Sequence, residues 1–380
     1  AQVLGFLTAA LGIYLLAWRW YRHEWAALLA SVAYTTAPFH LVNVYVRGDS
    51  LAEFWAMALY PWVILAADRL FTTEKEGFPY GRVAALALAY AVLILSHNIS
   101  ALIFTPFLLL FILLRWLFWQ RPIGESVPAL FSDQRFGTLL PMLGAGLLGL
   151  ALAAWFFLPA LAEQDFAQLG PVTQGYFYYA NHFRGGDLVQ TSTLFDVDVS
   201  GGSAFRMGLV QAFAALLGSA ALIYAAFRAR TVNWGTAFFI LLALAISTFM
   251  VTPLSLFLWD NLPLLSFTQF PWRFLSIQAF AAALAIGALA LLPYCRVVAI
   301  TTVVLLIISS FAGLQTDHLL LNDEDVGAES LAQYEWFSGN IGSTVSAEYL
   351  PQTVQPRFYT SAWLNDCLLY TSPSPRDQRP

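Results

Sequence analysis

Charged residues are scarce in this chain, and lysine is almost absent. Only 11% of the 380 residues are charged, the single lysine is Lys75, and 59% are hydrophobic. Soluble domains carry about a quarter charged residues, so this composition excludes that class and predicts a multi-pass membrane protein. The sequence contains no basic patch of the kind that would indicate nucleic-acid binding. Two cysteines and five scattered histidines predict neither a disulfide framework nor a metal site.

Long apolar runs make up most of the sequence. A bilayer-spanning helix needs roughly 20 mostly apolar residues, and about ten runs approach that length. They lie near residues 1–18, 25–46, 51–71, 82–96, 99–119, 136–161, 207–227, 235–251, 272–292 and 297–314. Pro38 should kink the second run, and Ser96-His97-Asn98 should divide 83–119 into two helices. Residues 254–258, inside the segment 253–271, are too few to cross and predict a re-entrant segment.

Arginine is distributed unevenly over the connections between these runs. Positive residues favour cytoplasmic loops, and most arginines fall on alternate connections. These are Arg19, Arg22, Arg69, Arg82, Arg115, Arg121, Arg135, Arg228, Arg230 and Arg296. We therefore expect an all-α transmembrane domain over 1–314, an external loop over 162–206, and the start of an extracytoplasmic polar domain over 315–365.

The two ends of the sequence are unlike those of a complete protein. Ala1 lies inside an apolar run and no Met precedes it, so we expect a fragment. Residues 366–380 resemble a translated sequencing adapter, and we expect them to be a non-native tail. The alternative is a disordered Ser/Pro-rich tail.

Several polar motifs keep the order of a known membrane-protein family. They are YVRGDSLAEF at 45–54, LYPW at 59–62, SHNISAL at 96–102, QFPWRFL at 269–275 and AEYLP at 347–351. In this combination the chain resembles the bacterial and archaeal 6-pyruvoyl-tetrahydropterin synthase-related membrane domain family over nearly all of 1–365. Pterin chemistry is not expected, because pterin synthases are soluble enzymes with a histidine zinc site.

The resemblance implies a GT-C-like architecture, that of integral-membrane glycosyltransferases and the related YfhO-type proteins. Such enzymes take a sugar from a polyprenyl-phosphate carrier at the outer face of the membrane. Their acidic catalytic residue usually lies in the first external loop, which has no counterpart in this sequence. The resemblance therefore predicts a glycosyltransferase, or a non-catalytic relative, in a prokaryotic cell membrane. Its expected partners are the lipid bilayer and the lipid-linked sugar, and no cofactor is identified.

Polar residues at helix ends on the expected external side are the candidate site. We predict Glu53, Asp49 and His97 as catalytic residues, with a carboxylate as general base. Arg47 and Arg273 would bind the carrier phosphate, because a guanidinium group matches phosphate oxygens and Arg273 lies at a helix amino terminus. Further substrate contacts are predicted at Asn98, His182, Arg184, Trp272 and Gln269.

Each of these candidates has a structural alternative. Ser50 and Glu53 have the spacing of a capping box, and Arg47 could pair with Asp49. Trp272 with its neighbouring arginine could anchor the chain at the membrane interface, and His97-Asn98 could be a polar turn between two helices.

The external loop offers weaker signals. Tyr176-Phe177-Tyr178-Tyr179 suits a carbohydrate but also an interfacial aromatic belt. Asp196 and Asp198 could ligate a divalent cation, although two carboxylates alone are weak evidence, and Asp260 is equally ambiguous. Alternative functions are a lipid or solute transporter and a structural membrane protein. Transporters place ionisable groups near the bilayer midplane, whereas these groups gather at helix ends.

Overall fold

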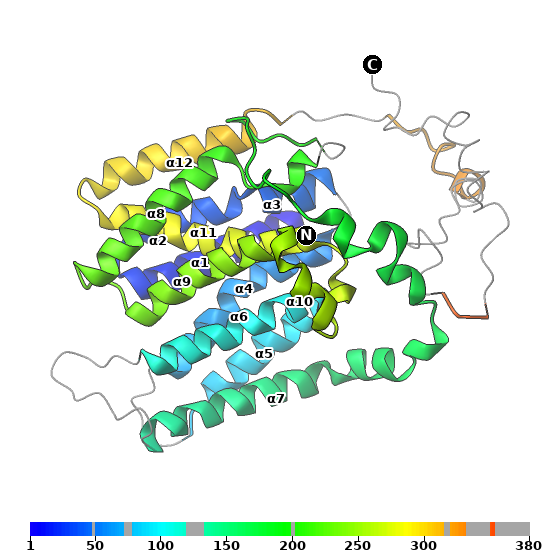
Figure 1. Ribbon diagram of the computed structural model, residues 1–380, viewed down its shortest axis with the longest axis horizontal. Helices are drawn as coiled ribbons and strands as arrows, with labels where there is room; N and C mark the ends of the chain where they lie inside the picture. Colours follow the sequence, from blue (N-terminus) through cyan, green and yellow to red (C-terminus); the bar gives the residue numbers. More distant parts are fainter. Residues whose placement is uncertain are drawn as a thin grey trace. The chain divides into compact units, whose positions relative to one another are not determined.

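Helices make up most of the chain that the structure describes. The computed structural model describes residues 1–47, 50–71, 78–118, 133–198, 202–314, 320–331 and 350–353, and no β-strand lies among them. The α-helices, labelled in Figure 1, are α1 (Gln2–Tyr21), α2 (Glu24–Thr35), α3 (Pro38–Leu41), α4 (Leu51–Leu70), α5 (Tyr80–Ser96), α6 (Asn98–Leu117), α7 (Asp133–Ala162), α8 (Leu209–Phe227), α9 (Trp234–Met250), α10 (Leu256–Asn261), α11 (Leu275–Gly287) and α12 (Cys295–Phe311).

Shorter helical segments join these helices. A π-helix, η1 (Val42–Val46), continues α3, and 3₁₀ turns flank α10 and α11. The 3₁₀ turns are η2 (Gln164–Phe166), η3 (Gly170–Thr173), η4 (Gly175–Phe177), η5 (Tyr179–His182), η6 (Ser203–Phe205), η7 (Pro253–Ser255), η8 (Leu265–Thr268), η9 (Pro271–Phe274) and η10 (Ala288–Leu291).

The helices are those of a multi-pass membrane protein. Six are long and apolar enough to cross a bilayer: α1, α4, α6, α8, Gly137–Ala162 of α7, and the continuous segment Pro271–Leu291. Two bent pairs would raise the number among the described residues to eight. Helices α5 and α12, with 17 residues each, are apolar but shorter. The multi-pass class is supported, and the count of ten stays a prediction.

The breaks predicted from the sequence are present. The chain bends by 44° between α2 and the segment Pro38–Val46, which begins at the expected proline. His97 separates α5 from α6. The predicted short segment forms α10, which turns by 92° from α9. These breaks matter for function because they leave irregular backbone, with its polar groups, at the ends of apolar helices.

Helix α11 is the centre of the bundle. All of its 13 residues are buried, and it packs against α2, α8 and α9. Its alanine-rich sequence lets neighbouring backbones approach closely. A Cβ atom at Gly218 of α8 would clash with the carbonyl oxygen of Ala285 in α11, so glycine is required there for this contact. The 3₁₀ turn η9, which carries Arg273, is thereby fixed to the core.

A buried ion-pair cluster joins α1, α4 and α6. Asp68 of α4 is 1% exposed. Its carboxylate accepts hydrogen bonds from Arg19 Nε at 2.5 Å and from Arg115 Nε at 2.8 Å. Arg82 donates to the carbonyl oxygen of Arg69, and Asn233 donates to that of Phe118. The arginine-rich connections predicted to be cytoplasmic therefore meet at one end of the helices, which we call the basic end.

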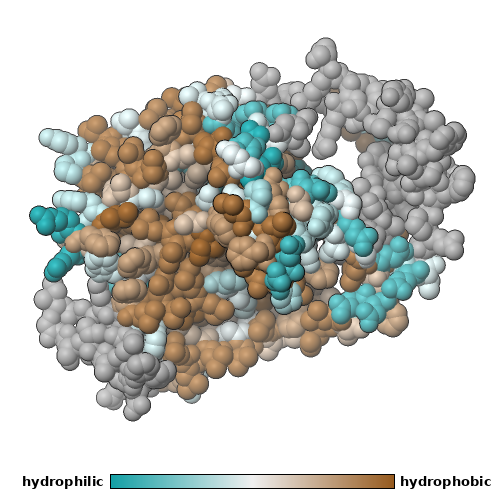
Figure 2. Space-filling view, viewed as in Figure 1, coloured by the Kyte–Doolittle hydropathy of each residue, from teal (hydrophilic) through white to brown (hydrophobic). Residues whose placement is uncertain are grey.

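Large apolar side chains are exposed along the middle of the helices, as expected for contact with lipid. Leu140, Leu143 and Leu147 of α7 and Leu216 and Leu217 of α8 are each about 60% exposed or more. Figure 2 shows apolar residues covering the middle of the face in view, with hydrophilic residues nearer its ends. This surface supports a bilayer environment.

The described residues divide into two compact units. The first contains Ala1–Phe156 and His182–Leu314, and the second contains Phe157–Asn181 and the described residues of Gln315–Pro380. In the second unit, Ala167 forms an isolated antiparallel bridge with Pro351. The backbone N–H of Gln168 donates to the carbonyl oxygen of Leu350. The expected domain boundaries stay predictions.

Candidate functional site

Glu53 is a buried carboxylate in the first turn of α4. A helix amino terminus favours a negative side chain at this position, but the side chain is only 3% exposed, so it also needs a partner. Its Oε2 accepts a 2.6 Å hydrogen bond from Arg47 Nη1. Its Oε1 is buried and has no hydrogen-bond partner among the described residues. Ser50 makes no side-chain capping bond, so the predicted capping-box alternative is wrong.

Arg47 follows directly on the π-helix η1. Its backbone N–H donates to the carbonyl oxygen of Val42, which extends the five-residue hydrogen-bond spacing to Arg47 itself. Its Nη1 also donates to Asn43 Oδ1 at 2.7 Å. The wider π turn therefore stacks Asn43 beneath the arginine and aims the guanidinium at Glu53. Single π turns occur frequently at functional sites.

Arg273 approaches the same carboxylate from the segment before α11. Its Nε lies 4.0 Å from Glu53 Oε2, and its side chain is 9% exposed. Its Nη1 donates to the carbonyl oxygen of Thr268 at 2.7 Å and to Gln269 Oε1 at 3.2 Å. Two neutral oxygens thus hold the guanidinium group in place beside Glu53.

A strained turn at Gln269 places those oxygens. Gln269 has φ 65° and ψ −49°, and Phe270 N–H donates to the Thr268 carbonyl oxygen at 2.7 Å. Together these define a γ-turn of positive φ, which is rare and strained for a residue with a side chain. The turn directs the backbone and side-chain oxygens of two successive residues toward Arg273. Strain of this kind clusters at functional sites.

Trp272 contacts both guanidinium groups. The Cζ atoms of Arg47 and Arg273 are 4.8 Å and 5.9 Å from its ring centroid. Phe205 and Phe270 stack on the ring at centroid distances of 4.4 Å and 4.8 Å. Trp272 and Phe270 are buried, so they exclude water from part of the surroundings of the arginine pair and strengthen its field.

His97 adds a neutral imidazole to the cluster. Burial lowers its pKa to about 4, the charge of Glu53 opposes that shift, and the charges of Arg273 and Arg47 add to it. His97 Nδ1 accepts the backbone N–H of Ser100 at 3.2 Å and thereby caps α6. In the neutral ring the proton is then on Nε2. His97 is suited to donating a hydrogen bond rather than to removing a proton.

An apolar groove lies beside this site. It has a volume of about 560 Å³ and is formed by α6, α9, α10 and the 3₁₀ turn η8. Leu102, Pro106, Ile246 and Leu262 are among the residues that line it. Thr268 also lines it, and its hydroxyl is buried without a hydrogen-bond partner among the described residues. The Thr268 carbonyl binds Arg273, so one residue connects the groove with the charged cluster.

Other predicted site residues are distributed unequally around this cluster. The His182 ring packs edge-on against Phe270 at 4.7 Å, beside the aromatic stack. Asn98 is exposed, and its Oδ1 accepts the N–H of Ile99. Asp49, and with it the proposed pairing to Arg47, lies outside the described residues.

Arg184 belongs to a different group of charges. Its guanidinium packs against Gly202, and its backbone N–H donates to the Val251 carbonyl oxygen. Burial lowers the pKa of Arg184, Asp187 opposes that shift, and Arg206 adds to it. Arg206 itself pairs with Asp187 at 2.7 Å. The predicted role of Arg184 as a contact in the same site as Arg47 and Arg273 gains no geometric support.

The other loop candidates are organised by local contacts. Asp196 Oδ1 accepts the backbone N–H of Asp198 at 3.0 Å, which is a local turn. Gln190 holds this turn, since its side chain bonds to the backbone of Asp196 and Ser203. No group of three or more possible metal ligands occurs in the part of the chain that the structure describes. Asp260 is exposed on α10, and residues 176–179 belong to the second unit.

Sequence reasoning missed three polar contributors. Asn43 and Thr268 hold the two arginines, and buried Tyr60 lies 3.3 Å from Ser276 Oγ at the start of α11. Asn43 was detectable as a lone amide four residues before Arg47 in an apolar run. Thr268 binds Arg273 through its backbone carbonyl oxygen. Every residue type has this group, so the sequence could not identify Thr268.

Comparison with models of known protein families and with curated proteins found no match. The family resemblance therefore stays a prediction.

Proposed function

We propose that the chain binds a polyprenyl-phosphate-linked substrate at the Arg47–Glu53–Arg273 cluster. In this proposal it is a GT-C-like glycosyltransferase or a non-catalytic relative. The observation that carries the proposal is the convergence of two guanidinium groups on one buried carboxylate, since Arg47 and Arg273 lie 2.6 Å and 4.0 Å from Glu53 Oε2. Two guanidinium groups held close together favour an anion, and guanidinium groups bind phosphate with two parallel hydrogen bonds.

The apolar groove supports a lipid as the carrier of that anion. A phosphate at Arg273 would lie close to Thr268, which also lines the groove. A hydrocarbon chain attached to the phosphate could then extend along α6 and α10. Burying such a chain contributes roughly 0.8 kcal/mol for each CH₂ group. A soluble anion would gain nothing from this groove.

Glu53 and His97 would have separate roles, as hydrogen-bond acceptor and hydrogen-bond donor. Glu53 Oε1 can accept a hydrogen bond from an acceptor hydroxyl, and it is the proposed general base in a catalytic protein. Neutral His97 would donate from Nε2 to a sugar or phosphate oxygen. In a non-catalytic relative the same groups would only hold the substrate.

Binding measurements on arginine variants test the phosphate contact. Arg47→Gln and Arg273→Gln should each weaken binding of a short-chain polyprenyl phosphate by about tenfold to a hundredfold, because charged hydrogen bonds contribute roughly 1.5 to 3 kcal/mol. Binding of the corresponding polyprenol, which lacks phosphate, should not change. Arg184→Gln is the matched control and should retain full affinity. Unchanged phosphate binding in both test variants would exclude the proposal.

A groove variant tests the lipid separately. Leu262 is half exposed in the groove wall, so Leu262→Trp should fold and fill part of the groove. It should abolish the gain in affinity that longer polyprenyl chains provide. If affinity in the unaltered protein does not depend on chain length, the groove is not the lipid site.

A lipid or solute transporter is the second candidate. The two bent helix pairs favour it, since both breaks leave irregular backbone in an apolar bundle. Movement of a fluorescent polyprenyl-phosphate analogue between leaflets of proteoliposomes, without sugar release, would identify a transporter.

A further inference from the structure

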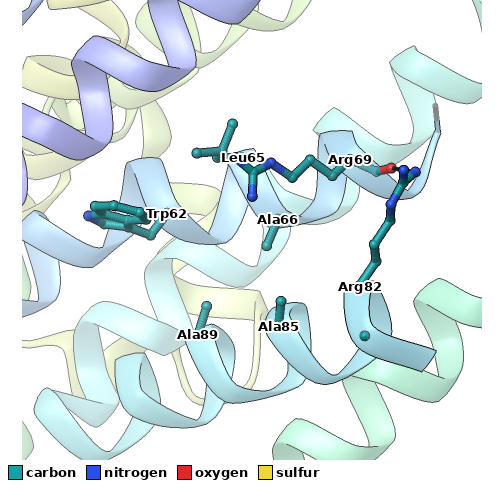
Figure 3. Close-up of a pocket in the computed structure, with 8 residues that line it drawn as sticks. Trp62, Leu65, Ala66, Arg69, Arg82, Ala85 and Ala89 are labelled. Carbon is teal, nitrogen blue, oxygen red and sulfur yellow. Dashed lines mark hydrogen bonds between the residues drawn. The ribbon is translucent and has the colours of Figure 1, made fainter. Parts of the chain in front are cut away.

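A second cavity lies between α4 and α5 at the basic end. It is a slot of about 320 Å³, and small side chains form much of its wall, including Ala66, Gly81, Ala85 and Ala89. Trp62 closes the far end and is fixed there by a 3.0 Å hydrogen bond from its Nε1 to the Thr8 carbonyl oxygen. Figure 3 shows Ala66 of α4 facing Ala85 and Ala89 of α5 across the space.

Two arginines stand at the mouth of this slot. Arg82 Nη1 donates to the carbonyl oxygen of Arg69 at 2.7 Å, which ties the start of α5 to the end of α4. Arg69 lies back along α4, so that its guanidinium is beside Leu65, over the slot (Figure 3).

We propose that this slot binds an anionic glycerophospholipid of the surrounding bilayer. The phosphate would lie against Arg69 and Arg82, and one acyl chain would occupy the space between α4 and α5. Basic pockets between transmembrane helices at the cytoplasmic surface recognise anionic lipid headgroups. The slot combines both elements of such a ligand, since its mouth is cationic and its wall is apolar.

Charge favours this ligand even when the whole connection is counted. From Arg69 to Arg82 the sequence carries three cations, Arg69, Lys75 and Arg82, against Glu74 and Glu76, which leaves one positive charge. The slot is at the opposite end of α4 from Glu53. The proposal is therefore independent of the proposed function.

A second copy of the chain fits less well. The spacing of Gly81, Ala85 and Ala89 would admit a neighbouring helix. A symmetric contact through the slot, however, would bring the arginines of both copies to the same interface, where like charges repel. A phosphate removes this repulsion, so a lipid suits the slot better.

Lipid binding to the purified full chain tests the proposal. Native mass spectrometry in neutral detergent should show preferential binding of phosphatidylglycerol over phosphatidylcholine with the same acyl chains. The double variant Arg69→Gln/Arg82→Gln should reduce phosphatidylglycerol affinity at least about tenfold and leave phosphatidylcholine binding unchanged. Arg228→Gln/Arg230→Gln removes the same charge from the same end and should retain the preference.

A slot variant separates the acyl chain from the headgroup. Ala85 is exposed on α5, so Ala85→Leu should fold and should weaken phosphatidylglycerol binding. Binding of glycerol 3-phosphate, which lacks acyl chains, should be weak and insensitive to this change. The proposal is wrong if phosphatidylglycerol shows no preference, if both arginine pairs lose it equally, or if Ala85→Leu dissociates a dimer without changing lipid binding.

Discussion

Glu53 accepts a 2.6 Å hydrogen bond from Arg47, and the same oxygen lies 4.0 Å from Arg273. One carboxylate thus holds two cations that come from segments far apart in the sequence. Its main interaction is electrostatic, and neither capping nor catalysis is needed to explain its burial. Four predictions separate these roles and test the arrangement around them.

Replacing Glu53 by Gln should destabilise the protein substantially. The change leaves two largely buried guanidinium groups without their shared counter-ion, and breaking a buried pair costs about 3 to 5 kcal/mol. The melting temperature in detergent should fall accordingly. Glu24→Gln is the control, because Glu24 is an exposed first-turn acid of α2 and its loss should cost about 1 kcal/mol or less. Equal effects of the two changes would show that Glu53 acts only as a first-turn acid.

Protonation of His97 should weaken the fold at acid pH. Its pKa is lowered from 6.5 to about 4, chiefly by burial, so the unfolded chain takes up the proton more readily than the folded one. The stabilisation is complete above pH 6.5 and is lost as the pH falls toward 4. His97→Asn keeps a helix-capping acceptor but does not titrate. The difference in melting temperature between pH 7 and pH 5 should be smaller in this variant than in the unaltered protein. An equal difference would show that His97 does not cause the loss of stability at acid pH.

At position 269, glycine should be more stable than alanine. The positive φ of Gln269 is strained for any residue with a Cβ atom, so Gln269→Ala should be less stable than Gln269→Gly by about 1 kcal/mol. Inside a helix or strand glycine is less stable than alanine. Ala226→Gly in α8 provides that comparison. Both Gln269 variants lose the side-chain oxygen that accepts a hydrogen bond from Arg273. The difference in stability between them therefore measures the backbone strain alone. Chemical denaturation curves would measure it, and a more stable alanine variant would rule out the turn.

Cysteine labelling tests the expected orientation. In a chain with Cys295 and Cys367 replaced by serine, Thr191→Cys should react with an impermeant maleimide on intact cells, because it lies in the expected external loop. Ala229→Cys, between Arg228 and Arg230, should react only after permeabilisation. Both positions are exposed, so access to the reagent decides the result. The reverse pattern would invert the proposed topology.

Local features of the fold were predictable from the sequence, whereas long-range pairings were not. Pro38 and His97 mark a bend and a turn because their effects act on their own backbone. The expected runs agree with most helices to within a few residues, since apolar length is a strong signal.

The site required the three-dimensional structure. Arg47 and Glu53 were predicted as neighbours in one motif, but nothing in residue type indicates that Arg273 reaches the same oxygen. Gln269 carries no sequence signal for positive φ, because glycine and asparagine are the usual residues there. The ion pairs of Asp68 with Arg19 and Arg115 could not be predicted for a similar reason. Both arginines lie at helix ends, where the sequence predicts cytoplasmic loop residues.

The two carboxylates of α4 have a consequence for synthesis of the protein. Glu53 and Asp68 are both buried, and α4 is the least apolar of the six long spans. A charged residue opposes the insertion of a lone helix, although less near the helix end than at its centre. The partner of Asp68 on α6, Arg115, is synthesised later. We expect the nascent α4 to stay beside the translocon until α6 has emerged from the ribosome, so that these helices enter the bilayer as a group.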